Sequence, residues 1–399
     1  METEAAQWAG QYRDELLDEV IPFWERYSLD KEFGGYFSCL GRTGEVFDTD
    51  KFIWLQGRQV WMFATLFNQV EERSDWLEIA EHGARFLIDH GHDGNFDFYF
   101  SVDRKGRPLE QPHSIFSNTF AAIGFGQLSR ATGNPEYTDA AMRSYQRVLD
   151  RRADPVAPYG KGFPGTRDLK AFALPMILSN VVLELEPQIG AEAVESLGTE
   201  VLETILRDFY RPEMGVIVEH VTPSGGFADC FEGRLVNPGH GIEAMWFLMD
   251  LAVRLKRPDV IQKAVEITLK TLERSWDTDY GGIYYFMDCK GRPPQELEWD
   301  QKLWWVHIET LIALLKGYQL TGSTDCWKWF EKVHAYTWEH FRDAENGGEW
   351  FGYLNRRGEV LLDLKGGKWK GCFHVPRGLF QCWRTLEAIA EADQFKSPR

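Results

Sequence analysis

The sequence predicts an all-α protein, an (α/α)6 barrel in which six inner and six outer helices surround one axis. Three observations predict this fold. A turn-rich segment recurs six times along the 399 residues, roughly every sixty residues. Each segment lies between an amphipathic run and a run that is apolar on nearly every side. Neither terminal unit has a polar capping helix, which favours closure of the ring over an open solenoid.

The turn segments combine acidic, glycine and aromatic residues, as in Asp277-Thr-Asp-Tyr-Gly-Gly-Ile-Tyr-Tyr-Phe286. Glycines of this kind favour tight turns and short β-hairpins. Because every segment precedes an inner helix, we expect the hairpins to lie together at one mouth of the barrel. The six segments begin at Asp30, Asp93, Asp154, Arg211, Asp277 and Asp343.

The two kinds of helix differ in the pattern of their apolar residues. Trp8, Tyr12, Leu16 and Val20 repeat every four residues with charges between them, which predicts an outer helix with one buried face. The runs that follow the turn segments are apolar all round, which predicts inner helices. These runs cover residues 51–69, 115–132, 167–185, 237–255, 303–320 and 372–390.

Composition is consistent with a single barrel domain over residues 1–399. This length exceeds that of a usual domain, but toroids built from repeats are an exception. A chain that is 44% hydrophobic and 14% aromatic can bury a large core. The net charge of -17 argues against a surface for nucleic acid or for an anionic membrane. No run approaches the roughly 18 consecutive apolar residues of a membrane helix.

The N-terminal segment and the cysteines predict a cytoplasmic protein. Residues 1–7 lack the basic and apolar regions of a signal peptide. The six cysteines form no CxxC pair and have no spacing typical of metal ligands. We therefore expect free thiols in a reducing compartment.

Polar residues recur at the beginnings of the predicted inner helices, next to the mouth. Their spacing repeats the period of the fold, so we expect them to converge on a shared cavity. They are Trp54, Gln56, Arg58, Ser117, Asn118, Lys170, Asn237, His240, Glu243, Trp304, Trp305, His307, Glu309, His374 and Arg377.

Two of the ten histidines, His240 and His374, are the strongest candidates for chemistry. Both begin inner helices beside carboxylates and arginines, where a buried imidazole needs a partner. Asn237 and Pro238 read as the N-cap and first residue of a helix, which places His240 in its first turn. The positive helix end would then keep this imidazole neutral. The histidines of the outer helices and their ends, by contrast, are expected at the surface: His82, His90, His92, His334 and His340.

Metal and phosphate sites are not predicted. The sequence has no HxxxH or HExxH spacing, so we expect no metal. The segment 159–166 contains Lys161 and four neighbouring glycine or proline residues, but it does not match GxxxxGK[ST]. An ordinary glycine-rich turn is the better interpretation.

Four segments together resemble the N-acylglucosamine 2-epimerases: 54–62 (WLQGRQVWM), 237–243 (NPGHGIE), 304–309 (WWVHIE) and 373–377 (FHVPR). The resemblance extends over nearly the whole chain. It implies an (α/α)6 barrel, usually a homodimer, that interconverts N-acetyl-D-glucosamine and N-acetyl-D-mannosamine without a metal. Cellobiose 2-epimerases and mannose isomerases share this barrel, and some carry a further histidine on the third inner helix. Residues 171–176 contain none, which favours the N-acyl sugar branch.

The resemblance also implies roles for individual residues. His240 and His374 would deprotonate and reprotonate C2 of the ring-opened sugar through an enediolate. Arg58 would stabilise charge on the C1 oxygen, and Glu309 would orient a histidine or hold a hydroxyl. ATP would act as an activator that is not consumed, with Lys161 as a nucleotide contact. Further expected substrate contacts are Tyr36, Trp54, Gln56, Asn118, Glu243, Trp305 and Arg377.

Three alternatives remain open from the sequence. A cellobiose 2-epimerase or mannose isomerase activity on the same barrel would use a neutral sugar. An inverting glycosidase would use two carboxylates such as Glu243 and Glu309 as acid and base, but it leaves the paired histidines unexplained. A binding role is the third alternative, because animal members of the family were also described as renin-binding proteins.

Overall fold

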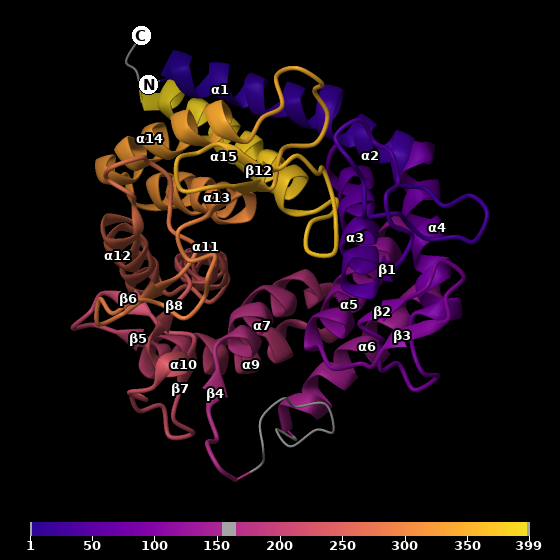
Figure 1. Cartoon of the computed structure of the whole chain (residues 1–399), viewed down its shortest axis with the longest axis horizontal. Helices are drawn as coiled ribbons and strands as arrows, with labels where there is room; N and C mark the ends of the chain where they lie inside the picture. Colours follow the sequence, from indigo (N-terminus) through magenta and orange to yellow (C-terminus); the bar gives the residue numbers. More distant parts are fainter. Residues whose placement is uncertain (1, 154–164, 397–399) are drawn as a thin grey trace.

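Two concentric rings of helices surround one axis in the computed structural model, which describes residues 2–153 and 165–396 (Figure 1). Within these residues the predicted six inner and six outer helices are confirmed. The inner helices are α3 (Ile53–Gln69), α5 (Ile115–Thr132), α7 (Ala173–Glu184), α11 (Pro238–Arg254), α13 (Trp304–Thr321) and α15 (His374–Lys396).

Each inner helix is preceded in the chain by an outer helix. The first outer helix is continuous but contains a π-helical turn, η1, and the fourth ends in another, η2. The outer elements are α1 (Glu2–Asp14), η1 (Glu15–Val20) and α2 (Ile21–Tyr27); α4 (Ser74–His90); α6 (Pro135–Ala153); α9 (Ala191–Thr204) and η2 (Ile205–Phe209); α12 (Pro258–Ser275); and α14 (Thr324–His340). Two short helices lie between these elements, α8 (Glu186–Ile189) and α10 (Phe231–Arg234).

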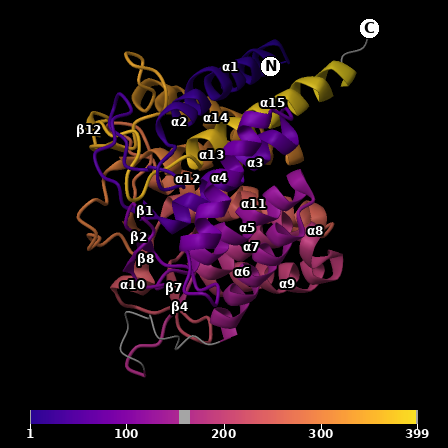
Figure 2. The same ribbon diagram turned by 90° about the vertical axis from the view of Figure 1, so that its right-hand side faces the viewer.

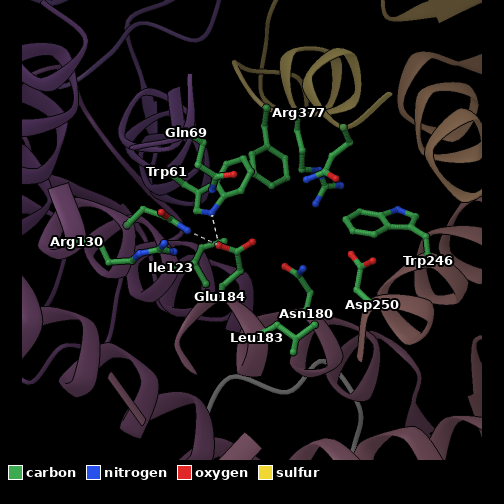
Figure 3. Close-up of a pocket in the computed structure, with 13 residues that line it drawn as sticks. Trp61, Gln69, Ile123, Arg130, Asn180, Leu183, Glu184, Trp246, Asp250 and Arg377 are labelled. Atoms are coloured by element: carbon green, nitrogen blue, oxygen red, sulfur yellow. Dashed lines mark hydrogen bonds between the residues drawn. The ribbon is translucent and has the colours of Figure 1, made fainter. Parts of the chain in front are cut away.

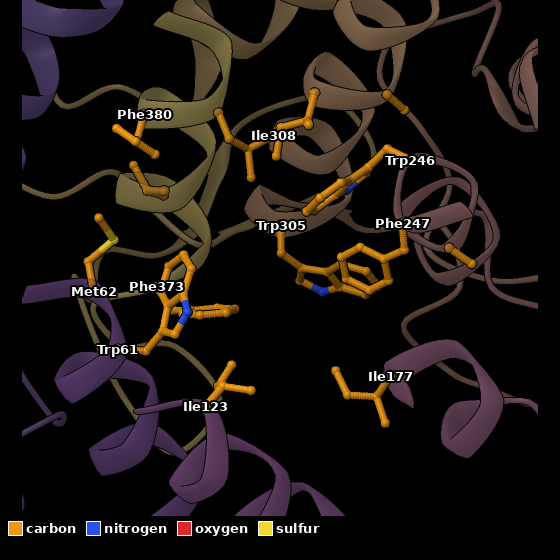
Figure 4. Packing of buried hydrophobic residues seen from close by; sticks show 14 of the residues in the cluster. Trp61, Met62, Ile123, Ile177, Trp246, Phe247, Trp305, Ile308, Phe373 and Phe380 are labelled. Carbon is orange, nitrogen blue, oxygen red and sulfur yellow. The ribbon is translucent and has the colours of Figure 1, made fainter. Parts of the chain in front are cut away.

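The inner helices form the core because they have no polar face. In α13, every residue from Trp304 to Leu315 is buried, and α11 is buried almost as completely. Aromatic and branched side chains point towards the axis from several sides, among them Trp61, Ile123 and Ile177 of inner helices and Phe373 just before α15 (Figure 4). The all-round apolar pattern in the sequence therefore corresponds to helices packed on every side.

The first outer helix closes the ring against the last unit. Helix α1 packs on α15, and Trp8 contacts the rings of Trp327 and Phe330 on α14. Tyr12 Oη lies 2.8 Å from His334 Nδ1. The expectation of a surface role for His334 is therefore wrong, because this imidazole packs among aromatic rings and burial lowers its pKa to about 4.

Short antiparallel strands connect neighbouring units at one end of the barrel. The strands before four inner helices, β1 (Lys51–Phe52), β4 (Lys170–Ala171), β8 (Leu235–Val236) and β10 (Lys302–Leu303), pair with strands of the next turn segment. Their partners and the remaining strands are β2 (Ser101–Val102), β3 (Pro108–Glu110), β5 (Tyr210–Arg211), β6 (Val216–Ile217), β7 (His220–Val221), β9 (Met287–Asp288), β11 (Tyr353–Leu354) and β12 (Val360–Leu362). The predicted helix starts at residues 51, 167 and 303 are therefore too early.

The hairpins gather at one end of the axis, which we call the mouth; the opposite end is the rear. Figure 2 shows β1, β2, β4, β7, β8 and β12 on the same side of the molecule. This confirms the predicted position of the described turn segments, whereas the third, which begins at Asp154, lies outside the described residues. No described helix is long and apolar enough to cross a membrane.

Buried aspartates at the starts of turn segments tie the units together. Asp30 accepts hydrogen bonds from Lys51 of its own unit at 2.9 Å and from Arg104 of the next unit at 3.0 Å. Burial raises the pKa of Asp30, but these two cations outweigh that effect and lower the pKa to about 2. Asp277 with Lys302 and Arg356, and Asp343 with Lys365 and Arg42, repeat the arrangement. Arg42 belongs to the first unit and Asp343 to the last, so the same kind of ion pair joins the two ends of the ring.

Candidate active site

His240 and His374 both lie beside one indole ring at the mouth. The Asn237 side chain accepts a hydrogen bond from the His240 backbone N–H at 3.2 Å, so His240 is held in the first turn of α11 as predicted. His374 begins α15. The ring of Trp305, from α13, lies 5.2 Å from the His240 ring and 5.8 Å from the His374 ring, measured between centroids. Three inner helices thus bring the two imidazoles together.

A buried carboxylate orients His374. Its Nδ1 lies 2.7 Å from Glu309 Oε1, and Glu309 also accepts hydrogen bonds from Arg377 at 2.5 Å and from Trp246 Nε1 at 2.9 Å. Arg377 additionally donates to Glu243 at 2.6 Å. Because a carboxylate accepts at Nδ1, the proton of the neutral imidazole lies on Nδ1 and the lone pair on Nε2. Glu309 therefore has the orienting position expected for it, and Nε2 is available as a base.

His240 has a carboxylate partner that sequence reasoning missed. Its Nδ1 lies 3.1 Å from both carboxylate oxygens of Glu219, a residue just before strand β7. Nothing in the sequence distinguishes Glu219 from the other carboxylates among the 61 acidic residues. Its position beside His240 depends on how the fourth turn segment folds over the start of α11.

The two histidines have opposite pKa shifts. Burial lowers the pKa of His374 well below its usual value, and the nearby Arg58 cation lowers it further. Burial also lowers the pKa of His240, but the Glu219 carboxylate outweighs this effect and leaves that pKa raised. The expectation that the helix end keeps His240 neutral is therefore wrong, because it ignored Glu219. Of the two imidazoles, His240 therefore holds a proton more readily than His374 does.

Arg58 is a buried cation at the wall of the site. Its guanidinium carbon lies 4.4, 4.1 and 4.5 Å from the ring centroids of Trp54, Phe120 and Phe373. It forms no ion pair with a described residue, and its Nε is buried without a hydrogen-bond partner. Burial lowers its pKa to about 9. The aromatic rings do not neutralise the positive charge of Arg58. Its guanidinium can therefore pair with a negatively charged atom of a ligand.

Three polar residues at inner-helix starts hold the fold together instead of facing the cavity. Gln56 makes two hydrogen bonds of 2.8 Å to the backbone of Tyr36. Asn118 accepts from the Phe98 N–H and donates to the Phe96 carbonyl, and His307 accepts from the Ile283 N–H. The equivalent positions of three units thus fasten the preceding turn segment to the inner helix, and this structural use explains why they are polar.

Tyr36 is similarly engaged in the fold. Its hydroxyl donates to the Ile79 carbonyl at 2.6 Å, and its side chain is only 1% exposed. The structure therefore does not bring Tyr36, Gln56 or Asn118 to the histidine pair, whereas it does bring Glu243, Trp305 and Arg377 there.

The rim of the mouth carries an aromatic pair, of which the sequence identified only Trp54. Trp369, in the loop before α15, lies 6.0 Å from Trp54 between ring centroids and is 55% exposed. Sequence reasoning missed Trp369 because it considered only helix starts. Buried ion pairs hold this loop at both ends, through Lys365 with Asp343 and Lys370 with Glu349. An exposed indole on an anchored loop is suited to contact a sugar ring.

Glu243, Glu309 and His374 have ligand atoms within 4.8 Å of one another, as in a metal site. Both carboxylates, however, already accept hydrogen bonds from Arg377, whose fixed charge opposes a second cation. The same geometry argues against the inverting glycosidase, because its two carboxyl groups need about 6.5–9.5 Å between them for a water molecule. The nucleotide contact expected at Lys161 lies outside the described residues.

Known proteins resemble the chain along most of its length. The sequence model of the N-acylglucosamine 2-epimerase (GlcNAc 2-epimerase) family matches residues 35–376. The N-acylglucosamine 2-epimerase of Bos taurus is 40% identical, covering 94% of this chain and 90% of its own. That of Homo sapiens is 37% identical, covering 94% and 89%. The structure of cellobiose 2-epimerase from Spirochaeta thermophila DSM 6192 superposes with a TM-score of 0.83 at 21% identity, covering 97% of this chain and 98% of that chain, which shows the same fold.

Proposed function

The chain belongs to the N-acylglucosamine 2-epimerase family, and we propose that it interconverts N-acetyl-D-glucosamine and N-acetyl-D-mannosamine. The observation that carries this proposal is the pair His240 and His374, which both lie beside Trp305 and have opposite pKa shifts. Inversion at one carbon needs a base on one face and an acid on the other. A neutral imidazole opposite a protonated one meets this need without a metal.

The reaction proceeds on the open-chain sugar. His374 Nε2 removes the C2 proton of one epimer, and the electrons move onto the C1 oxygen to give an enolate, because C2 carries an acetamido group and not a hydroxyl. Arg58 stabilises that oxyanion through its unpaired guanidinium. His240 then delivers its proton to the opposite face of C2, which restores the aldehyde with inverted configuration. The reverse reaction uses the same two groups with their protonation states exchanged.

Turnover in D₂O tests the proposed activity directly. We expect N-acetylmannosamine to convert to N-acetylglucosamine with deuterium at C2, followed by ¹H NMR. A glycosidase would instead release new reducing ends from an oligosaccharide and leave C2 unlabelled. Absence of N-acetylglucosamine, or product without deuterium at C2, would contradict the proposal.

The pH dependence of kcat/KM tests the effect of Glu219 on the protonation of His240. The active form has His374 neutral and His240 protonated, so kcat/KM falls on the alkaline side as His240 loses its proton. Glu219→Gln removes the charge that raises the pKa of His240, and we expect this alkaline limb to move to lower pH. The pH profiles of kcat/KM for the wild type and the variant measure the shift.

Glu219→Asp is the matched control for this prediction, because it retains the negative charge. Its alkaline limb should remain nearer that of the wild type. If Glu219 only held the hairpin in place, Glu219→Gln would lower the rate at every pH equally. An unmoved limb in this variant would thus contradict the assignment of His240 as the protonated partner.

Three further properties are part of the proposal and rest on membership of the family: a homodimer, a cytoplasmic location, and activation by ATP that is not consumed. The choice of an N-acyl sugar over a neutral one is supported by α7, which contains no histidine and directs Ile177 towards the axis (Figure 4).

A further inference from the structure

A second cavity, of about 160 Å³, opens at the rear of the barrel (Figure 3). Its walls come from α3, α5, α7, α11 and α15. Asp250, which lines it, lies ten residues beyond His240 on α11, so the two side chains are separated by about 15 Å along the axis. The far wall of the rear cavity therefore lies well away from His240.

The rear cavity and the active site share a partition of three side chains. Arg377, Phe373 and Trp246 line the rear cavity. Arg377 and Trp246 also donate hydrogen bonds to Glu309, the partner of His374. A molecule in the rear cavity would therefore touch the groups that position His374 without entering the mouth.

Asn180 places a side-chain amide in this cavity. Its side chain is only 9% exposed, lines the cavity and points into it (Figure 3). Among the described residues, its amide has no hydrogen-bond partner. Because the amide has both a donor and an acceptor free, the site is suited to a ligand that both donates and accepts hydrogen bonds.

Glu184 offers a second polar contact beside Asn180. Its Oε2 accepts hydrogen bonds from Trp61 Nε1 and Gln127 Nε2, both at 2.8 Å, as the dashed lines in Figure 3 show. These bonds fix the carboxylate, while no described residue donates to Oε1. A rigid acceptor next to an amide is an arrangement that binds neighbouring hydroxyl groups.

The charges of the rear cavity do not favour an ion. Asp250 is paired with Lys316 at 2.9 Å, and Arg377 is paired with Glu243 and Glu309. The remaining charged residues are Glu184 and the exposed Arg130 at the edge of the cavity, whose charges are opposite in sign. The apolar walls are the aromatic rings of Trp61, Trp246 and Phe373, which suit the C–H faces of a sugar ring.

We propose that the rear cavity binds a small neutral polyhydroxy compound of the monosaccharide class, with Asn180 and Glu184 as its polar contacts. The inference goes beyond the proposed epimerase activity and does not depend on it. The barrel would then have a sugar site at each end. The sugar at the rear would contact Arg377 and Trp246 of the partition.

Methyl N-acetyl-β-D-glucosaminide is a suitable probe because its blocked C1 prevents ring opening and turnover. We expect a crystal of the full chain soaked in it to show the glycoside between Trp61 and Trp246, with a hydrogen bond to Asn180. In calorimetric titrations, Asn180→Leu should weaken this rear binding about tenfold, which reflects the loss of one buried hydrogen-bonding group. Ser179→Ala, one residue away and outside the cavity, should bind like the wild type.

Glycoside density confined to the mouth, or only water in the rear cavity, would overturn the inference. Equal affinities of the wild type, Asn180→Leu and Ser179→Ala would do the same. Turnover of N-acetylmannosamine is measured separately on the same proteins. A chain that epimerises but leaves the rear cavity empty would refute this inference alone, and a chain that fills the rear cavity without turnover would refute only the proposed function.

Discussion

His374→Ala is expected to lower kcat for both epimers by about 10²- to 10⁴-fold, the range for loss of one positioned acid or base. The same side chain removes the proton in one direction and returns it in the other, so neither direction is spared. The fold should tolerate the change, because Glu309 keeps its hydrogen bonds from Arg377 and Trp246. Steady-state rates with each epimer and a thermal melt measure the two effects.

His240→Ala is the matched comparison, and isotope exchange separates the two variants. With His374 intact, the His240 variant should still exchange the C2 proton of one epimer with D₂O, but without inversion. The His374 variant should exchange only the other epimer. Inversion by either variant at more than about a tenth of the wild-type rate would rule out a mechanism with two bases.

The helical architecture was predictable because it depends on local patterns. The all-round apolar run of α13 and the amphipathic spacing of Trp8, Tyr12 and Leu16 each specify which sides of a helix are buried. The strands that precede the inner helices were not predictable at this level, since Phe52 and Leu303 continue the apolar run of the following helix in the sequence. They become strands because the hairpin of the following unit pairs with them.

The site was predicted in part, and the errors have one physical cause. Position along the period placed His240 and His374 at the mouth, as found. The period could not show which way a polar side chain points. Gln56 was therefore expected to contact the substrate, although it hydrogen-bonds to the backbone of the preceding turn segment. The protonation of His240 depends on Glu219, and that contact forms only in the folded chain.

Arg58→Met is expected to lower kcat by about 10²- to 10³-fold, the usual effect of removing one stabilising contact to an oxyanion. The negative charge on the C1 oxygen develops only in the enolate, so KM should change much less than kcat. Kinetics with both epimers measure this difference. A variant that raises KM but keeps kcat would show that Arg58 only binds the ground-state sugar.

Arg377→Met is the contrasting variant, because two buried arginines in contact with Phe373 are used in different ways. Arg377 neutralises Glu243 and Glu309, so its removal leaves buried carboxylates unpaired and should cost about 3–5 kcal/mol of the free energy of unfolding. Arg58 has no carboxylate partner among the described residues. Replacing Arg58 removes favourable cation–π contacts, but it also removes the unfavourable burial of a charge. We therefore expect the free energy of unfolding to fall by no more than about 2 kcal/mol. Urea denaturation of both variants tests the difference: if Arg58→Met proves as unstable as Arg377→Met, the guanidinium of Arg58 is structural and the oxyanion needs another donor.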